Sequence, residues 1–294
     1  MSGLRHKHDL GQHFLRDEAF LRSLVAATGV TPADGVLEIG PGLGDLTRCL
    51  CRAAGKVVAV EVDQAVLPAL REATKGFENL TLVVGDIRRQ DLRAITRPLG
   101  DGFYVIANIP YNITTPIFDL LWQSGLPIRQ ISVMVQREVA QKLMAAPGSP
   151  AYGLLSVRCQ YRCLPTLVAD APAALFTPPP KVDSAFVRLD MRAQPPAPVR
   201  DEALLWRMVR AGFNQRRKTL VNALGGAAEA KALTAALESL GLDARLRGEA
   251  LGVEEWIALS NALCDLSGCG TPATCKRQTT PGTPAPEGND TAAR

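Results

Sequence analysis

The sequence of 294 residues has no CxxC pair and no apolar run that approaches the ~20 residues needed to cross a membrane. Its seven cysteines are odd in number and lack zinc-site spacing, so we expect free thiols in a reducing compartment and no bound metal. The polar N-terminal stretch has no apolar core of the kind that a secretory signal contains. These absences favour a cytoplasmic protein and argue against a membrane-spanning one.

The composition is that of a globular protein with room for two domains. Hydrophobic residues make up 47% of the chain, which supports a sizeable core, and no internal repeat is visible. The formal net charge of +4 permits a nucleic-acid partner without requiring one.

Apolar runs alternate with helical patterns through the first half of the chain. This alternation predicts βαβ units and a mostly parallel sheet covered on both faces, a Rossmann-like α/β fold. Two later segments rich in β-forming residues, 153–163 and 183–189, have no long helix between them, so we expect them to pair antiparallel at one sheet edge. The expected parallel strands are 36–39, 56–60, 80–84, 103–107 and 131–136, with helices such as 46–54 and 64–74 between them.

A Pro-rich segment, 194–198, reads as a linker between two domains. The pattern after it is helical, over 201–213, 217–224, 227–240 and 253–266. Beyond residue 266 the chain is poor in large apolar residues, which predicts a disordered tail. We therefore expect a cofactor-binding domain at 1–193, a small all-α domain at 199–266 and a tail at 267–294.

A glycine-rich turn follows the first expected strand. Its glycines at 40, 42 and 44 let the backbone pass close to a ligand. A nicotinamide fingerprint needs its third glycine where Asp45 stands, so the spacing disfavours a dehydrogenase. The tighter Gly-x-Gly-x-Gly pattern favours S-adenosylmethionine, with Gly40 and Gly42 against it.

Acids follow the next two expected strands. Glu61 lies about twenty residues after the glycines, where an acid commonly binds ribose hydroxyls. Asp86 ends the third strand, where its carboxylate can accept a hydrogen bond from an adenine amine. Ligands of such sheets bind at the carboxyl ends of the strands, so acids at several ends predict one site.

The fourth expected strand ends in Asn108-Ile109-Pro110-Tyr111, a rigid turn that holds one amide and one aromatic ring. The side-chain oxygen of Asn108 and a carbonyl of Ile109 or Pro110 can accept the two hydrogens of an exocyclic amine. The ring of Tyr111 can stack on the face of the same base. The turn therefore predicts a site for a flat base, although an ordinary Pro turn is the simpler alternative when the tetrapeptide is taken alone.

Five motifs in order resemble those of the rRNA adenine dimethyltransferase family, and most closely the bacterial 16S rRNA enzymes. The resemblance covers about residues 9 to 265 and departs from the family at His13, where Asn is common. It implies that His13, Leu15 and Asn108 contact S-adenosylmethionine, and that Phe176 stacks on the adenine face opposite Tyr111. The motifs are GQHFL at 11–15, EIGPGLGDLT at 38–47, NIPY at 108–111, FTPPPKVDS at 176–184 and FNQRRKTL at 213–220.

The start of the helical region is strongly basic. Residues 200–220 hold six basic side chains against two acidic ones, a local net charge of +4. We expect Arg216, Arg217 and Lys218 to contact RNA phosphates. The resemblance further implies dimethylation of two adjacent adenosines in the 3′-terminal hairpin loop of 16S rRNA, on an immature small subunit. We expect a monomer.

Three alternatives remain open. The first is a 23S rRNA adenine methyltransferase of the macrolide-resistance type. The second is a ribosome assembly factor that keeps the fold but not the chemistry, although the intact turn at Asn108 and the pair Glu61 and Asp86 argue for activity. The third is a methyltransferase for a small molecule, which would leave the basic helices unexplained.

Overall fold

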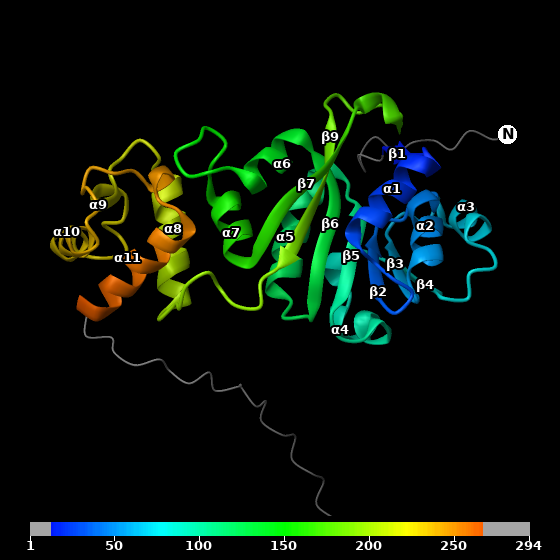
Figure 1. The fold of residues 1–294 in the computed structure, drawn as a ribbon, viewed down its shortest axis with the longest axis horizontal. Helices are drawn as coiled ribbons and strands as arrows, with labels where there is room; N and C mark the ends of the chain where they lie inside the picture. Colours follow the sequence, from blue (N-terminus) through cyan, green and yellow to red (C-terminus); the bar gives the residue numbers. More distant parts are fainter. Residues whose placement is uncertain (1–12, 267–294) are drawn as a thin grey trace, which may run out of the picture.

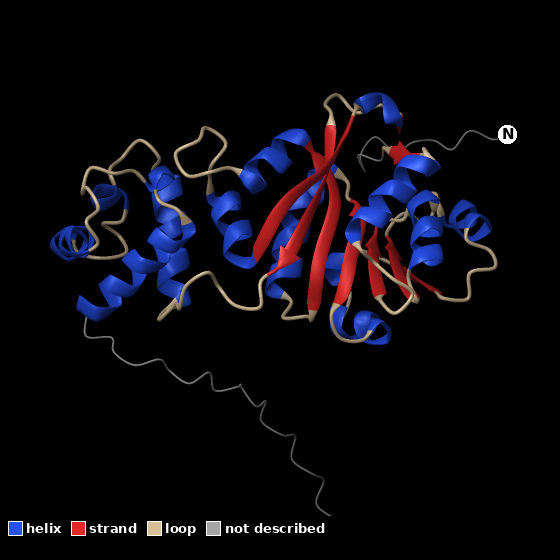
Figure 2. Cartoon of the chain, in the orientation of Figure 1, coloured by secondary structure: helices blue, strands red, loops and turns tan. Residues whose placement is uncertain are grey.

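The computed structural model describes residues 13–266, in which a seven-stranded sheet carries helices on both faces and joins a group of helices at one end (Figure 1, Figure 2). Five neighbouring strands are parallel, and the last two add an antiparallel edge. The predicted fold class is therefore confirmed. The strands, in spatial order, are β4 (Leu80–Val84), β3 (Lys56–Glu61), β2 (Gly35–Ile39), β5 (Phe103–Asn108), β6 (Ile128–Gln136), β9 (Ser184–Met191) and β7 (Cys163–Ala171). A separate antiparallel pair joins β1 (Phe14–Leu15) to β8 (Phe176–Thr177).

The central strands are buried on both faces, which explains their unbroken apolar runs. Successive side chains of a strand point to opposite sides. Val36 packs in the cluster that contains helices α1 (Glu18–Thr28) and α2 (Asp45–Ala53), while its neighbour Leu37 packs in the cluster that contains α5 (Thr114–Gln123). The helices around the sheet are α1 (Glu18–Thr28), α2 (Asp45–Ala53), α3 (Leu67–Ala73), α4 (Leu92–Thr96), α5 (Thr114–Gln123), α6 (Arg137–Met144) and α7 (Leu154–Arg162).

The segment 153–163 corrects one prediction, because most of it is the helix α7 and the strand β7 begins only at Cys163. Opposite faces of α7 enter two different cores. Val157 packs among the C-terminal helices, whereas Cys159 packs against the sheet. A helix that is apolar on two sides loses the one-sided 3.6-residue pattern, so its β-forming residues imitate a strand. The antiparallel pairing at the edge is formed by β9 with β7.

The C-terminal helices enclose the second core around Trp256, which is fully buried. Tyr152, which precedes α7, belongs to this core and donates its hydroxyl to the carbonyl of Leu251 at 2.9 Å. The helix expected at 217–224 is shorter than predicted and begins after Thr219. These helices are α8 (Glu202–Asn214), α9 (Leu220–Ala223), α10 (Ala230–Ser239) and α11 (Val253–Leu266).

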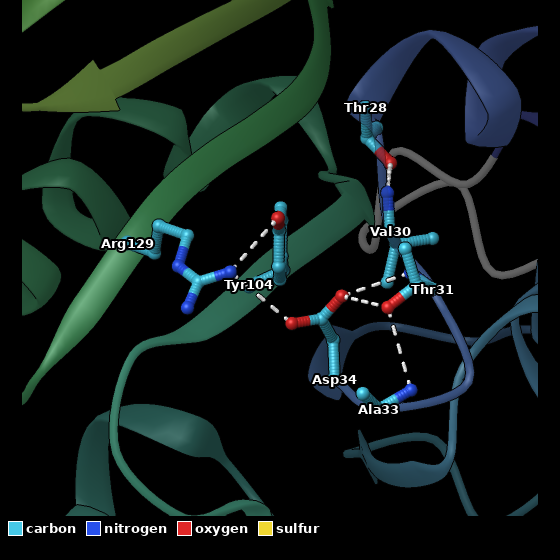
Figure 3. A network of polar contacts seen from close by, with 7 residues as sticks. All are labelled: Thr28, Val30, Thr31, Ala33, Asp34, Tyr104 and Arg129. Carbon is cyan, nitrogen blue, oxygen red and sulfur yellow. Dashed lines mark hydrogen bonds and ion pairs between the residues drawn. The ribbon is translucent and has the colours of Figure 1, made fainter.

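A polar network ties the sheet together at the amino ends of its strands (Figure 3). Asp34 accepts hydrogen bonds from the backbone and hydroxyl of Thr31 at 2.9 and 2.6 Å. The same carboxylate forms an ion pair with Arg129 at 3.2 Å, and Arg129 reaches the hydroxyl of Tyr104 at 3.4 Å. This network lies at the end opposite the carboxyl ends of the strands, where it links the residue before β2 to β5 and β6.

Some predictions fall outside residues 13–266. Gly11 and Gln12 of the first motif and the tail 267–294 are among them. Within the described residues, no helix combines the length and apolar character that a membrane span requires.

Candidate functional site

A cleft lies at the carboxyl ends of β2, β3, β4 and β5. Parallel strands all end at the same edge of a sheet, so polar residues that directly follow different strands meet there. All the predicted cofactor residues, together with Tyr111, line this cleft. They are His13, Leu15, Gly40, Gly42, Glu61, Asp86 and Asn108.

The glycine-rich turn lines the cleft. Gly42 has a φ of 57°, and a Cβ placed on it would lie 2.9 Å from the ring of Phe14. A side chain at this position would therefore be strained and would push away the N-terminal segment. The backbone N–H of Gly42 donates to Oε2 of Glu61 at 2.9 Å, which joins the turn to the end of β3.

Glu61 is buried, and both of its carboxylate oxygens accept backbone hydrogen bonds. Oε1 accepts from the N–H of Asp63 at 2.8 Å, and Oε2 from that of Gly42. Burial raises the pKa of Glu61, while these N–H groups oppose the rise. Because each carboxylate oxygen can accept a further bond, the held carboxylate can still bind ligand hydroxyls.

Glu38 is a site residue that our sequence analysis did not assign. Only 1% of it is exposed, it lines the cleft, and its Oε2 has no hydrogen-bond partner within residues 13–266. Burial raises the pKa of Glu38 to about 8, the nearby hydroxyl of Thr47 opposes part of this rise, and the charge of Glu61 adds to it. Neither the Thr47 hydroxyl nor Oε2 of Glu38 makes a hydrogen bond within the described residues. A buried carboxyl oxygen without a partner is costly, so it marks a place where a ligand donor or cation fits. The available signal was its position as the acid that opens the glycine motif at 38–47.

Asp86 sits at the end of β4 and begins the short helix η2 (Ile87–Arg89). Its Oδ1 accepts the N–H of Arg88 at 3.0 Å, and the guanidinium of Arg88 binds the carboxylate at 2.6 Å. The hydrogen bond from Arg88 lowers the pKa of Asp86, so this carboxylate is ionised and acts as a hydrogen-bond acceptor. Both residues line the cleft.

The orientation of the Asn108 amide follows from its neighbour. Nδ2 of Asn108 donates to the backbone carbonyl of His13 at 3.1 Å. A carbonyl only accepts, so the amide nitrogen must face His13 and Oδ1 must point the other way. The described residues offer this oxygen no donor, and Asn108 lines the cleft, so Oδ1 is available to a ligand.

Tyr111 begins η4 (Tyr111–Ile113) and is held by two side chains from distant parts of the chain. The ring of His13 stacks on it, with centroids 5.6 Å apart and an interplanar angle of 24°. Its hydroxyl is hydrogen-bonded to that of Ser184. Nδ1 of His13 also lies 2.8 Å from the carbonyl of Pro178. His13 therefore connects the turn at 108–111 to the FTPPPKVDS motif at 176–184.

Phe176 is the one predicted catalytic residue that does not line the cleft. It pairs with Leu15 between β8 and β1, is 2% exposed and packs in the core beside α1 and α2.

The three predicted RNA-contact residues fall into two groups. Arg217 and Lys218 are exposed and make no ion pair within the described chain. Arg216 instead donates to the carbonyl of Tyr152 at 2.8 Å and pairs with Glu249 at 3.3 Å. Arg216 therefore links the loop before α7 to the C-terminal helices.

Among residues 13–266, no three His, Cys, Asp or Glu side chains are grouped so that they could hold a metal ion.

Comparison with known proteins gives a consistent result. Residues 3–265 match the family described as ribosomal RNA adenine dimethylase. A ribosomal RNA small subunit methyltransferase A from Geobacillus thermodenitrificans is 42% identical over 275 residues, which is 90% of this chain and 93% of that protein. The protein of the same name from Geobacillus kaustophilus is 43% identical over 274 residues, or 90% of this chain and 94% of the relative.

Solved structures agree with the sequence relatives. A dimethyladenosine transferase from Plasmodium falciparum aligns with a TM-score of 0.71 and 26% identity, over 84% of this chain and 96% of that one. The 23S rRNA methyltransferase ErmE aligns with a TM-score of 0.66 and 29% identity, over 85% and 99% of the two chains. Both similarities extend beyond the sheet, because they span more than four fifths of this chain.

Proposed function

Because the chain belongs to the ribosomal RNA adenine dimethylase family, we propose that it methylates the exocyclic amines of adenosines in small-subunit rRNA. It is an rRNA adenine dimethyltransferase that uses S-adenosylmethionine. The chemistry rests on the Asn108 amide, whose Oδ1 is turned away from His13 in the cleft that Tyr111 also lines.

One observation, independent of the family, supports a fit of S-adenosylmethionine to the cleft. Its amino-acid end carries an ammonium group, and Oε2 of Glu38 is a buried acceptor that lacks a partner. We propose that Glu38 holds this ammonium, Glu61 the ribose hydroxyls and Asp86 the adenine amine. The backbone at Gly40 and Gly42, with His13 and Leu15, would enclose the rest. When bound, the cofactor supplies a methyl group on a positively charged sulfur.

The target amine needs two acceptors, because its lone pair is delocalised into the adenine ring. Acceptors for both amine hydrogens favour a more tetrahedral nitrogen, which frees the lone pair for attack. Oδ1 of Asn108 would supply one acceptor. The carbonyl of Pro110 already accepts the N–H of Ile113 at 3.1 Å and the hydroxyl of Thr114 at 3.5 Å, so both of its lone pairs are engaged and we assign the second acceptor to the carbonyl of Ile109. The methylated nitrogen loses its proton readily, and catalysis is mainly positioning and electrostatics.

Stacking would hold the extruded base. Tyr111 is half-buried and lines the cleft, so its ring is available to the adenine. Stacking of this kind contributes ~1–3 kcal/mol per base. A stacking role for Phe176 requires β8 to turn this ring out of the core when RNA binds, because the ring is buried.

We propose that the substrate is the immature small subunit, and that the targets are two adjacent adenosines in the 3′-terminal hairpin loop of 16S rRNA. The enzyme would act in the cytoplasm as a monomer. The family resemblance supports this substrate, and identity above 40% to two small-subunit methyltransferases agrees with it.

Methyl transfer from radiolabelled S-adenosylmethionine tests this function directly. Undermethylated small subunits, large subunits and naked DNA would be compared under the same conditions. We expect label on adenosines of the small subunit alone. Label on the large subunit would favour the macrolide-resistance type of activity. Cofactor binding without label on any nucleic acid would favour a non-catalytic assembly factor.

The double substitution Arg217→Ala and Lys218→Ala is expected to weaken RNA binding without changing cofactor affinity. Two lost phosphate contacts should reduce the slope of log affinity against log salt by roughly 1.4–1.8. Binding to small subunits at several salt concentrations measures this slope. An unchanged slope would show that these exposed cations do not contact phosphate.

Arg216→Ala is expected to act on stability instead. Its bond to the Tyr152 carbonyl and its half-exposed pair with Glu249 should together contribute about 1 kcal/mol to the free energy of unfolding. Arg217→Ala is the matched control, with an expected change within about 0.5 kcal/mol. Urea denaturation compares the two variants. Equal stability of both would mean that the Arg216 contacts do not hold the helices to the loop.

A further inference from the structure

Ser184 is not among the residues that line the cleft, but it contacts the hydroxyl of Tyr111, whose ring is proposed to stack on the target base. It is the first residue of β9, is fully buried, and its hydroxyl is hydrogen-bonded to the hydroxyl of Tyr111. Its backbone is held from both sides, since it pairs with Gln136 of β6 and Ala171 of β7. Ser184 is therefore a rigid anchor for a residue 73 positions away in the sequence.

The pairing satisfies both hydroxyls. A buried serine hydroxyl without a partner is costly, and the phenol of Tyr111 is the partner that the structure provides. Burial raises the pKa of Tyr111, so its phenol keeps its proton through the neutral range and the two hydroxyls can share one hydrogen bond.

The two contacts of Tyr111 restrict different motions. The hydroxyl lies on the long axis of the ring, so its bond to Ser184 fixes where that axis points but leaves rotation about the axis free. The stacked ring of His13 limits that rotation, because turning the plane would break the stack. Together the contacts define both the direction and the plane of the ring.

We infer that Ser184 is a positioning residue for methyl transfer, which holds the Tyr111 ring in the orientation that receives the adenine. This inference rests on the proposed function of Tyr111. An adenine that stacks on a fixed ring keeps its amine near Oδ1 of Asn108, whereas a ring free to tilt lets the amine leave the attack position. Ser184 acts only through Tyr111 and does not touch the base.

A double-mutant cycle tests the inference. Ser184→Ala and Tyr111→Phe each remove one hydroxyl and should preserve the backbone fold. Tyr111→Phe also keeps the aromatic ring. We expect each to lower kcat for methylation of small subunits roughly 3- to 10-fold, the range for one lost hydrogen bond. KM for the RNA should stay within about 2-fold, because phosphate contacts dominate binding. The double variant should be no slower than either single one.

Two further variants complete the test. Ser184→Thr keeps the hydroxyl and should recover most of the lost kcat. Ser132→Ala is the matched control, since Ser132 is also fully buried, lies in the neighbouring strand β6 and bonds only Gln130 at 2.7 Å in the described chain. Its kcat should equal that of the wild type.

The inference is overturned if Ser184→Ala or Tyr111→Phe has wild-type kcat, or if the double variant shows the product of the two single losses. Should Ser184→Ala fail to fold, Tyr111→Phe alone decides, because the tyrosine ring is only half-buried. Failure of the proposed function looks different. In that case the wild-type enzyme itself transfers no methyl group to small subunits.

Discussion

Asn108→Ala is expected to lower kcat for methyl transfer roughly 100-fold or more, the usual loss when one preorganised polar group is removed from a reacting centre. The substitution removes Oδ1, which no residue of the described chain engages, and also the bond from Nδ2 to the His13 carbonyl. The target amine would then lose one of its two acceptors. Single-turnover transfer of labelled methyl groups to small subunits measures this effect separately from product release.

Asn79→Ala is the matched control for Asn108→Ala. Nδ2 of Asn79 donates to the carbonyls of Cys51 and Ala54, both at 2.9 Å, at the amino end of β4. Its loss should lower stability by about 1 kcal/mol and leave kcat unchanged. If Asn108→Ala retains near-normal turnover, the proposed role in positioning the amine is wrong.

Glu38→Gln is expected to weaken binding of S-adenosylmethionine roughly 30-fold or more, because it leaves the ligand ammonium without its buried counter-charge. The amide keeps the size of the carboxyl, so packing around β2 should be preserved. Isothermal titration calorimetry of the variant and the wild type measures the difference. Unchanged affinity would place the ammonium elsewhere in the cleft.

The protonation of Glu38 supplies a second test. In the native protein its pKa is raised from 4.5 to about 8, so the folded state keeps a proton that the unfolded state has released within this window. The contribution of Glu38 to the free energy of unfolding therefore falls as pH rises from about 4.5 to about 8. Glu38→Gln removes this dependence of the free energy of unfolding on pH. The variant should be more stable than the wild type near pH 8.

Cofactor binding should reverse the protonation of Glu38. An ammonium beside the carboxyl favours its charged form, so the wild type is expected to release a proton on binding near neutral pH. Calorimetry in two buffers with different ionisation enthalpies measures this release. Release of the same size from Glu38→Gln would assign the proton to another group.

Several elements were predictable because their signals are local. The apolar run at β5 and the glycines that follow β2 each depend on a few consecutive residues, and the structure places them as expected. The helix α7 was not predictable in this way. Its two apolar faces serve two cores, one of which is built by Trp256 about a hundred residues later.

The sequence by itself determined the family, the sheet and the edge at which Glu61, Asp86 and Asn108 meet, because parallel strands carry their carboxyl ends to one side. Only the tertiary structure decided how individual side chains are used. The bond between Tyr111 and Ser184 spans 73 positions, and that between Arg216 and Tyr152 spans 64. Oε2 of Glu38 is buried without a hydrogen-bond partner because of the residues that pack around it. Such contacts are set by how distant segments pack, and no local pattern encodes them.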